Sequence, residues 1–124
     1  MFSISLRKDF TSQHSFPKSV GSERFRHSHP YKIELTLLGD GLGEDGFLVD
    51  LERMGAILDE VVSQIDGAYL NDLPEFQARN PSLENFSRVI WTWVAERLKE
   101  LRVERMKVTV WESDDARASY EQVM

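Results

Sequence analysis

The chain of 124 residues contains no cysteine. This absence excludes disulfide bonds, thiolate metal ligands and a cysteine nucleophile. Any metal in this protein must be held by nitrogen and oxygen atoms. Any general base must be a histidine, glutamate, aspartate or lysine side chain. If every histidine binds metal, no imidazole remains for proton transfer.

Two other features are missing from the sequence. The first is an excess of positive charge: acidic residues outnumber basic ones, and the net charge is -6. This argues against a nucleic-acid partner, because phosphate binding needs a basic surface. No apolar run approaches the roughly 20 residues of a membrane span, and no signal peptide is recognised at Met1. We therefore expect a cytoplasmic protein without a membrane partner. Its length predicts a single domain over residues 1–124.

The chain has only three histidines, and all of them fall between positions 14 and 29. A strand places residues i and i+2 on one face, so His27 and His29 would point the same way. If His14 lies on a neighbouring antiparallel strand, the three imidazoles converge. Three neutral imidazoles without a fourth protein ligand are typical of a catalytic zinc site. Alternatively, His27 and His29 belong to a polar loop and His14 is an ordinary surface residue.

Apolar residues alternate with polar ones in two N-terminal stretches, Phe2–Phe16 and His27–Leu37, as in half-buried strands. In the second stretch both histidines share a face with apolar residues. Burying an imidazole without a partner costs a few kcal/mol, and a metal ion is one way to satisfy it. Pro30 lacks an N–H, so this end of the strand is expected at an edge or a bulge, where a site can open.

Two amphipathic helices follow in the middle of the chain. Asp50 is the expected N-cap of the first helix, which runs to about Gln64, with Gly67 as its end signal. Ser82 is the expected cap of the second helix, which runs to about Leu101.

The last part of the chain returns to strand patterning. Met106, Val108 and Val110 share one strand parity, and Glu112 continues it as an unusual acid on an apolar stripe. The tail, Ala118–Met124, is expected to pair with this strand. The order of two strands, two helices and two strands (ββααββ) predicts an α+β fold. It has a four-stranded antiparallel sheet with both helices on one face.

Several weak motifs occur in a fixed order, and together they are more specific than any one of them. Through these motifs the chain resembles the family of 6-pyruvoyl-tetrahydropterin synthase and 6-carboxytetrahydropterin synthase. The resemblance extends from Phe10 to about Ser113. The motifs are Phe10-Thr-Ser-Gln-His14, His27-Ser-His29, Gly46-Phe-Leu-Val-Asp50-Leu, Asp66 with Tyr69-Leu-Asn-Asp72, Pro81-Ser-Leu-Glu84-Asn85 and Val108-Thr-Val-Trp-Glu112.

The resemblance implies a T-fold, in which the sheets of three subunits close into a barrel and two rings stack into a hexamer, a dimer of trimers. It implies that His14, His27 and His29 bind zinc. It also implies that Glu112 anchors the pterin, with a carboxylate that accepts two N–H bonds from the amino-pyrimidinone edge.

The resemblance is incomplete at the catalytic positions. The family uses a cysteine as base, assisted by an Asp-His pair. Here Glu23 stands where the cysteine would be, and one branch of the family carries Glu at that place. Asp66 matches the aspartate, whereas Gly67 occupies the histidine's position.

Three interpretations remain open at this point. The protein is a zinc-dependent lyase acting on dihydroneopterin triphosphate or a related pterin, with Glu23 moving the proton. Alternatively, Glu23 is a fourth zinc ligand in a pterin-binding protein without the parent activity, or the chain is a purely structural T-fold subunit. A triphosphate would also need a basic wall, for which Lys18, Arg24, Arg26 and Arg117 are candidates or are ordinary surface charges.

Overall fold

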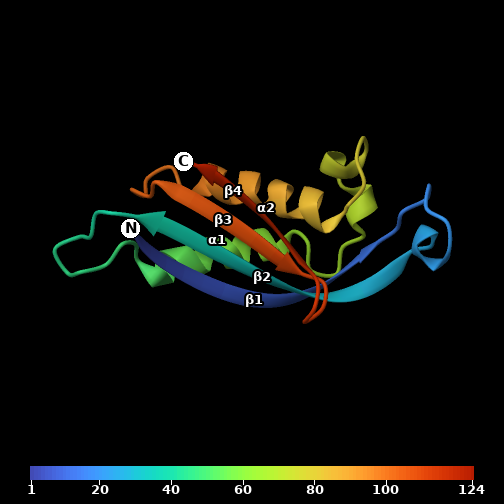
Figure 1. Ribbon diagram of the computed structural model, residues 1–124, viewed down its shortest axis with the longest axis horizontal. Helices are drawn as coiled ribbons and strands as arrows, with labels where there is room; N and C mark the ends of the chain where they lie inside the picture. The colour runs from blue at the N-terminus through green and yellow to red at the C-terminus, as the bar shows by residue number, and fades with distance from the viewer.

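The computed structural model describes residues 1–124. Four strands and two α-helices follow one another in the predicted ββααββ order (Figure 1). The elements are β1 Phe2–His14, η1 Ser22–Arg24, β2 His27–Gly39, α1 Leu51–Ser63, η2 Leu70–Asp72, η3 Pro74–Phe76, α2 Leu83–Arg97, β3 Arg105–Trp111 and β4 Arg117–Val123.

The strands form one antiparallel sheet in the order β1-β2-β3-β4. β1 and β2 pair along their whole length, from Phe2 opposite Gly39 to His14 opposite His27. β3 is shorter and pairs only with residues 32–38 of β2. The histidine end of the β1–β2 hairpin therefore extends beyond β3 and β4, as Figure 1 shows on its right-hand side. Pro30 lies in this extension, which confirms the expected edge position.

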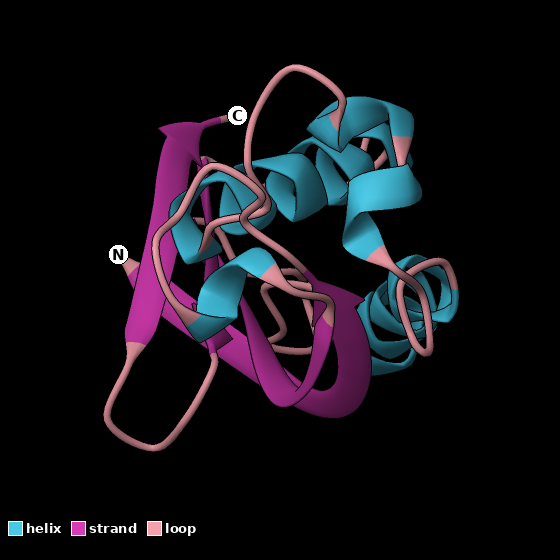
Figure 2. Cartoon of the chain, turned by 90° about the vertical axis from the view of Figure 1, so that its right-hand side faces the viewer, coloured by secondary structure: helices cyan, strands magenta, loops and turns pink.

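Both helices cover the same face of the curved sheet (Figure 2). The predicted caps are confirmed, because the Asp50 side chain accepts from the backbone N–H of residue 52, and the Ser82 hydroxyl accepts from that of residue 85. Each such cap satisfies a donor that has no partner inside the helix. The prediction of an α+β fold with an antiparallel sheet is confirmed.

The predicted end of the first helix, at about Gln64, is confirmed, whereas Gly67 as its end signal and the predicted end of the second helix are wrong by a few residues. α1 ends at Ser63, and Gly67 instead lies in the following turn with φ +76°. Its N–H donates to the carbonyl of Thr11, so the chain leaves the helix to hydrogen-bond the edge of β1. α2 ends at Arg97, not near Leu101, because the chain turns there to enter β3.

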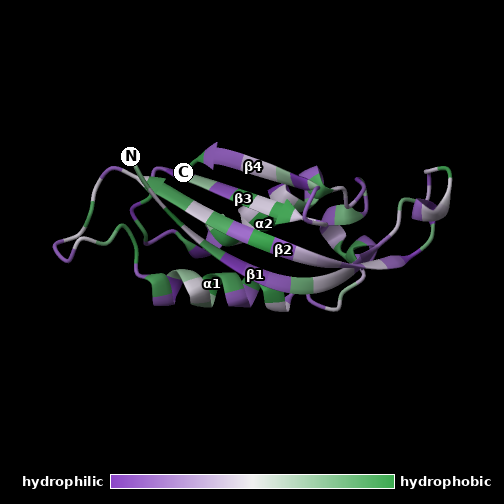
Figure 3. Cartoon of the chain, turned by 60° about the horizontal axis from the view of Figure 1, so that its bottom comes forward, coloured by the Kyte–Doolittle hydropathy of each residue, from purple (hydrophilic) through white to green (hydrophobic).

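The core lies between the sheet and the two helices. The inward positions of β2 from Tyr31 to Leu37 and those of β3 are buried, and they meet apolar side chains of α1 and α2. Figure 3 shows the resulting alternation of hydrophobic and hydrophilic positions along the strands. None of the helices is long and apolar enough to cross a membrane. The opposite face of the sheet carries mainly polar side chains.

Candidate functional site

The three histidines meet at the extended end of the β1–β2 hairpin. His14 is the residue directly opposite His27, and His29 follows two positions further along the same face of β2. The ring centroids are 4.5 Å (His14–His27), 4.9 Å (His14–His29) and 4.8 Å (His27–His29) apart. One nitrogen from each ring lies within 4.8 Å of the others, so the group can hold a metal ion. The predicted convergence is confirmed, while the metal itself remains a prediction.

In each ring one nitrogen, called here the outer nitrogen, contacts a polar group outside the cluster. These contacts fix which nitrogen of the ring is free for a metal. Nδ1 of His27 lies 2.7 Å from the carbonyl oxygen of Phe25, which can only accept. His27 therefore carries its proton on Nδ1 and a lone pair on Nε2. Nε2 of His29 lies 2.9 Å from Oε1 of Glu112. This carboxylate oxygen accepts a hydrogen bond, as the carbonyl oxygen of Phe25 does. His29 thus keeps its lone pair on Nδ1.

His14 is the most enclosed member of the cluster, with 2% of its surface exposed. Its Nδ1 is 3.0 Å from the hydroxyl of Tyr31, whereas Nε2 is buried and has no hydrogen-bond partner. Burial, and secondly the charges of His27 and His29, lower the pKa of His14 to about 4. The imidazole is therefore neutral at pH 7, which is the form that binds metal. A zinc ion would satisfy the unpartnered Nε2, and the donor set fits it.

Tyr31 is a site residue that the sequence patterns did not single out. Burial, and secondly the negative charge of Glu112, raise the pKa of its hydroxyl above the usual range, so it stays protonated. Its ring stacks on Phe10 with centroids 5.3 Å apart, and this packing holds the hydroxyl against His14. The only signal in the sequence was its parity, since it lies two residues after His29.

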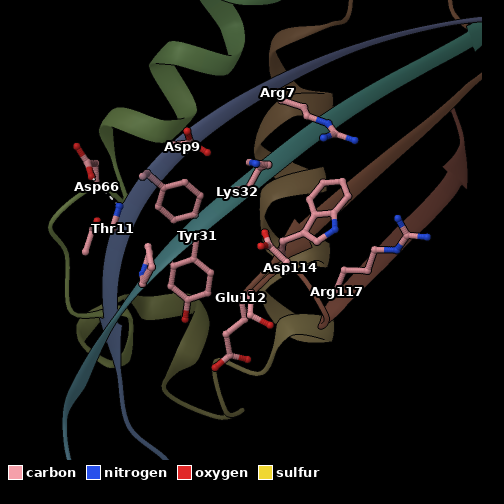
Figure 4. Close-up of a pocket in the computed structure, with 13 residues that line it drawn as sticks. Arg7, Asp9, Thr11, Tyr31, Lys32, Asp66, Glu112, Asp114 and Arg117 are labelled. Carbon is pink, nitrogen blue, oxygen red and sulfur yellow. Dashed lines mark hydrogen bonds between the residues drawn. The ribbon is translucent and has the colours of Figure 1, made fainter.

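A hollow of about 730 Å³ shares two lining residues with the surroundings of the histidine cluster. Figure 4 shows the side chains that line it. Tyr31 and Glu112 connect the hollow to the cluster. Both line the hollow, and Tyr31 contacts His14 while Glu112 contacts His29. The other residues that line it are Arg7, Asp9, Phe10, Thr11, Pro30, Lys32, Asp66, Trp111, Ser113, Asp114 and Arg117. A ligand in this hollow would lie next to the cluster.

The two predicted catalytic carboxylates have different surroundings. Asp66 lines the hollow, and its Oδ1 accepts a hydrogen bond of 3.0 Å from the backbone N–H of Thr11. Glu23 lies in η1, between β1 and β2, and its side chain is exposed. The backbone carbonyl of Glu23 accepts from the N–H of Phe16 at 2.8 Å, which ties η1 to the end of β1. Glu23 is not a member of the metal-capable cluster.

Of the four basic residues considered from the sequence for a phosphate group, only Arg117 lines the hollow. Arg26 instead stacks over the ring of Tyr69, 4.2 Å from its centroid. Two further cations line the hollow, Arg7 on β1 and Lys32 on β2. Their positions on β1 and β2 gave no signal in the sequence, because single cations on strands usually face solvent.

The fold and the cluster define a class: an α+β domain of the T-fold type with a histidine triad beside a ligand-sized hollow. The family follows from comparison with known proteins. The family model described as 6-pyruvoyl tetrahydropterin synthase matches residues 3–123, and the chain belongs to this family of pterin-metabolising enzymes. The resemblance seen in the sequence is thereby confirmed.

Two relatives in sequence have names that refer to pterins. A protein of Archaeoglobus fulgidus, provisionally named 6-carboxy-5,6,7,8-tetrahydropterin synthase, is 32% identical over 107 residues, covering 85% of this chain and 84% of the relative. The dihydroneopterin monophosphate aldolase of Pyrococcus furiosus is 24% identical over 115 residues, covering 90% of each chain.

Solved structures confirm the fold. The 6-pyruvoyl tetrahydropterin synthase of Plasmodium falciparum superposes with a TM-score of 0.82 at 16% identity, covering 99% of this chain and 98% of that one. The synthase of Plasmodium vivax, in a variant that replaces a catalytic glutamate by cysteine, gives a TM-score of 0.76 at 19% identity with both chains fully covered.

Proposed function

We propose that the protein is a zinc-dependent pterin lyase or synthase that acts on dihydroneopterin triphosphate or a related pterin. The observation that carries the proposal is the histidine cluster, in which each ring has one nitrogen free for a metal and lies beside a ligand-sized hollow. The names of the two sequence relatives support a pterin as substrate. The proposal includes one catalytic domain over residues 1–124 and assembly of several copies, as the family resemblance implies.

His14, His27 and His29 would hold the zinc through Nε2, Nε2 and Nδ1. When bound there, zinc polarises hydroxyl groups of the substrate side chain and stabilises negative charge that develops on them. The contribution of the chain is to keep the free nitrogens aimed at one point. Phe25, Tyr31 and Glu112 do so by holding the outer nitrogens, as outer-shell partners of metal ligands generally do.

Glu112 is the proposed pterin anchor. Its Oε1 accepts from His29, and a carboxylate has about four acceptor positions, so the remaining ones are open to N–H groups of the heterocycle. The carboxylate is 31% exposed and faces the hollow. One side chain would then orient both a metal ligand and the substrate ring, which couples the position of the substrate to that of the metal.

Glu23 is the proposed base that takes a proton from a carbon atom of the substrate side chain. Its carboxylate has no hydrogen-bond or ion-pair partner within the chain, so both of its oxygens are free to accept a proton. Glu23 lies in η1, shortly before β2 begins at His27. The catalytic glutamate of the P. vivax synthase supports a residue of this type as base. Asp66, which lines the hollow, is proposed as a second carboxylate that relays the proton.

A second candidate is a pterin-binding protein that has lost the lyase step. Gly67 favours it, because this residue stands where the family resemblance expects a catalytic histidine. In the structure Gly67 serves the backbone, with a positive φ and an N–H bond to the carbonyl of Thr11.

The test is incubation of zinc-loaded protein with dihydroneopterin triphosphate, with products separated by chromatography. We expect turnover in the wild type and loss of at least 100-fold in Glu23→Gln, which removes the base. Glu44→Gln is the matched control, since Glu44 lies in the loop at the opposite end of the hairpin. Zinc content is measured in every sample. Substrate that binds but is not converted would favour the second candidate, and loss of zinc in the Glu23 variant would indicate a fourth ligand.

A further inference from the structure

The segment that follows α1, residues 65–72, lies against the free edge of β1. It contains the motif Tyr69-Leu-Asn-Asp72, to which the proposed function gives no role. Gln13 forms an isolated parallel bridge with this segment, and its N–H donates to the carbonyl of Ala68 at 2.8 Å. The opposite edge of β1 pairs with β2 up to His14. The histidine end of β1 is therefore held from both sides.

Asn71 extends this contact by one side chain, to the residue that follows His14. Its Oδ1 accepts from the backbone N–H of Ser15 at 2.9 Å, and its Nδ2 donates to the backbone carbonyl of Ser15 at 2.9 Å. The amide thus offers one residue the same donor and acceptor that a neighbouring strand would offer. Both backbone groups of Ser15 are satisfied by one side chain, so the backbone directly after His14 is fixed.

Tyr69 adds a second contact to Ser15 and also reaches the neighbouring strand. Ser15 is buried, and its hydroxyl lies 2.6 Å from the hydroxyl of Tyr69. The guanidinium carbon of Arg26 lies 4.2 Å from the centroid of the Tyr69 ring, and Arg26 directly precedes His27. The segment therefore contacts the residues next to two of the three histidines.

The attachment of the segment to β1 does not depend on Asn71 alone. The N–H of Gly67 donates to the carbonyl of Thr11 at 2.6 Å, and Asp66 accepts from the N–H of Thr11 at 3.0 Å. Together with the bond from Gln13, these contacts anchor the segment on the N-terminal side of the histidine. The amide of Asn71 acts on the other side. Its removal is therefore expected to release only the end of the strand, while the segment keeps its fold.

We propose that Asn71 is a positioning residue of the metal site, which fixes the backbone at Ser15 and so keeps the unpartnered Nε2 of His14 aimed at the metal position. Asn71 itself would touch neither metal nor substrate. Zinc binds nitrogen ligands at about 2.0–2.1 Å and tolerates deviations of about 0.2 Å, so a small movement of this backbone weakens the site. The inference rests on the proposed function for the metal, and it gives a role to a residue that this function leaves unused.

The first test is zinc affinity, measured by chelator competition on Asn71→Ala and Asn71→Asp. We expect both variants to bind zinc about 10-fold more weakly, as is typical when an outer-shell partner of a metal ligand is lost. The aspartate keeps the size of the side chain but turns an oxygen toward the carbonyl of Ser15. Gln122→Ala on β4 is the matched control, because it removes an amide that accepts from Tyr120 at 2.7 Å, at the end of the sheet away from the histidines. Leu35→Ala, a change in the buried core, controls for lost stability alone.

Two further measurements separate positioning from stability. The visible spectrum of the cobalt(II)-loaded protein reports the ligand geometry, and it should change in the Asn71 variants but not in Gln122→Ala or Leu35→Ala. In chelator-treated protein, the nuclear Overhauser effect between the rings of His14 and His27, whose centroids are 4.5 Å apart, should weaken in Asn71→Ala. Urea unfolding midpoints verify that the variants are folded.

Wild-type zinc affinity and an unchanged cobalt(II) spectrum in both Asn71 variants would overturn this inference and leave the proposed function intact. A wild-type chain that binds no zinc would count against the proposed function. In that case an unchanged Overhauser effect in Asn71→Ala would overturn this inference, and a weakened one would support it.

Discussion

Acidification of the metal-free protein is expected to reduce its stability through His14. This side chain is 2% exposed, and its pKa is lowered from 6.5 to about 4 by burial first and by His27 and His29 second. In the unfolded chain the same imidazole titrates near 6.5, so between pH 6.5 and 4 the unfolded state binds more protons. The free energy of unfolding therefore falls as the pH falls through this window. At 1.36 kcal/mol per pH unit, the full loss is about 3 kcal/mol, and about 2.5 kcal/mol of it is reached at pH 4.5.

The assay is urea unfolding of chelator-treated protein, followed by circular dichroism between pH 7.5 and 4.5, for the wild type and His14→Leu. Carboxylates that titrate in this range affect both proteins alike, so the difference between the two curves isolates His14. We expect the wild type to lose about 2.5 kcal/mol more than the variant by pH 4.5. Proton NMR of the wild-type imidazole gives the pKa of His14 directly. Parallel stability curves, or a His14 that titrates near 6.5, would refute the interpretation of a buried neutral ligand.

Three further substitutions test the site and the fold. Tyr31→Phe keeps the ring but removes the hydroxyl that holds Nδ1 of His14, so zinc affinity should fall about 10-fold in a chelator competition; an unchanged affinity would show that another group orients the ring. Leu35→Ala removes a side chain that is 0% exposed at the centre of the sheet, and urea unfolding should show a loss of about 3 kcal/mol with zinc affinity retained. Ser82→Ala removes the N-cap of α2 and should cost about 1 kcal/mol; a loss below 0.3 kcal/mol would mean that water replaces the cap without penalty.

The parts of the fold that could be predicted from the sequence are those set by neighbours along the chain. Asp50 and Ser82 mark helix starts because each cap bond closes within three residues. Alternation of apolar residues identifies the strands, because a strand has a period of two. The path of the chain beyond the helices could not be predicted in this way. The chain after Ser63 leaves the helix for hydrogen bonds with β1, and Ile65 is buried although it lies beyond the helix.

The sequence by itself determined that His27 and His29 share a face and that any metal here has nitrogen and oxygen ligands. Only the tertiary structure decided what completes the site. The register that sets His14 opposite His27, and the contact of Glu112 with His29, join residues distant along the chain. The row of Lys32, Trp111 and Arg117 likewise exists only because two strand ladders, β2–β3 and β3–β4, place these residues side by side. Local periodicity fixes the face on which a side chain lies, whereas strand register, set by packing of the whole sheet, fixes its neighbours.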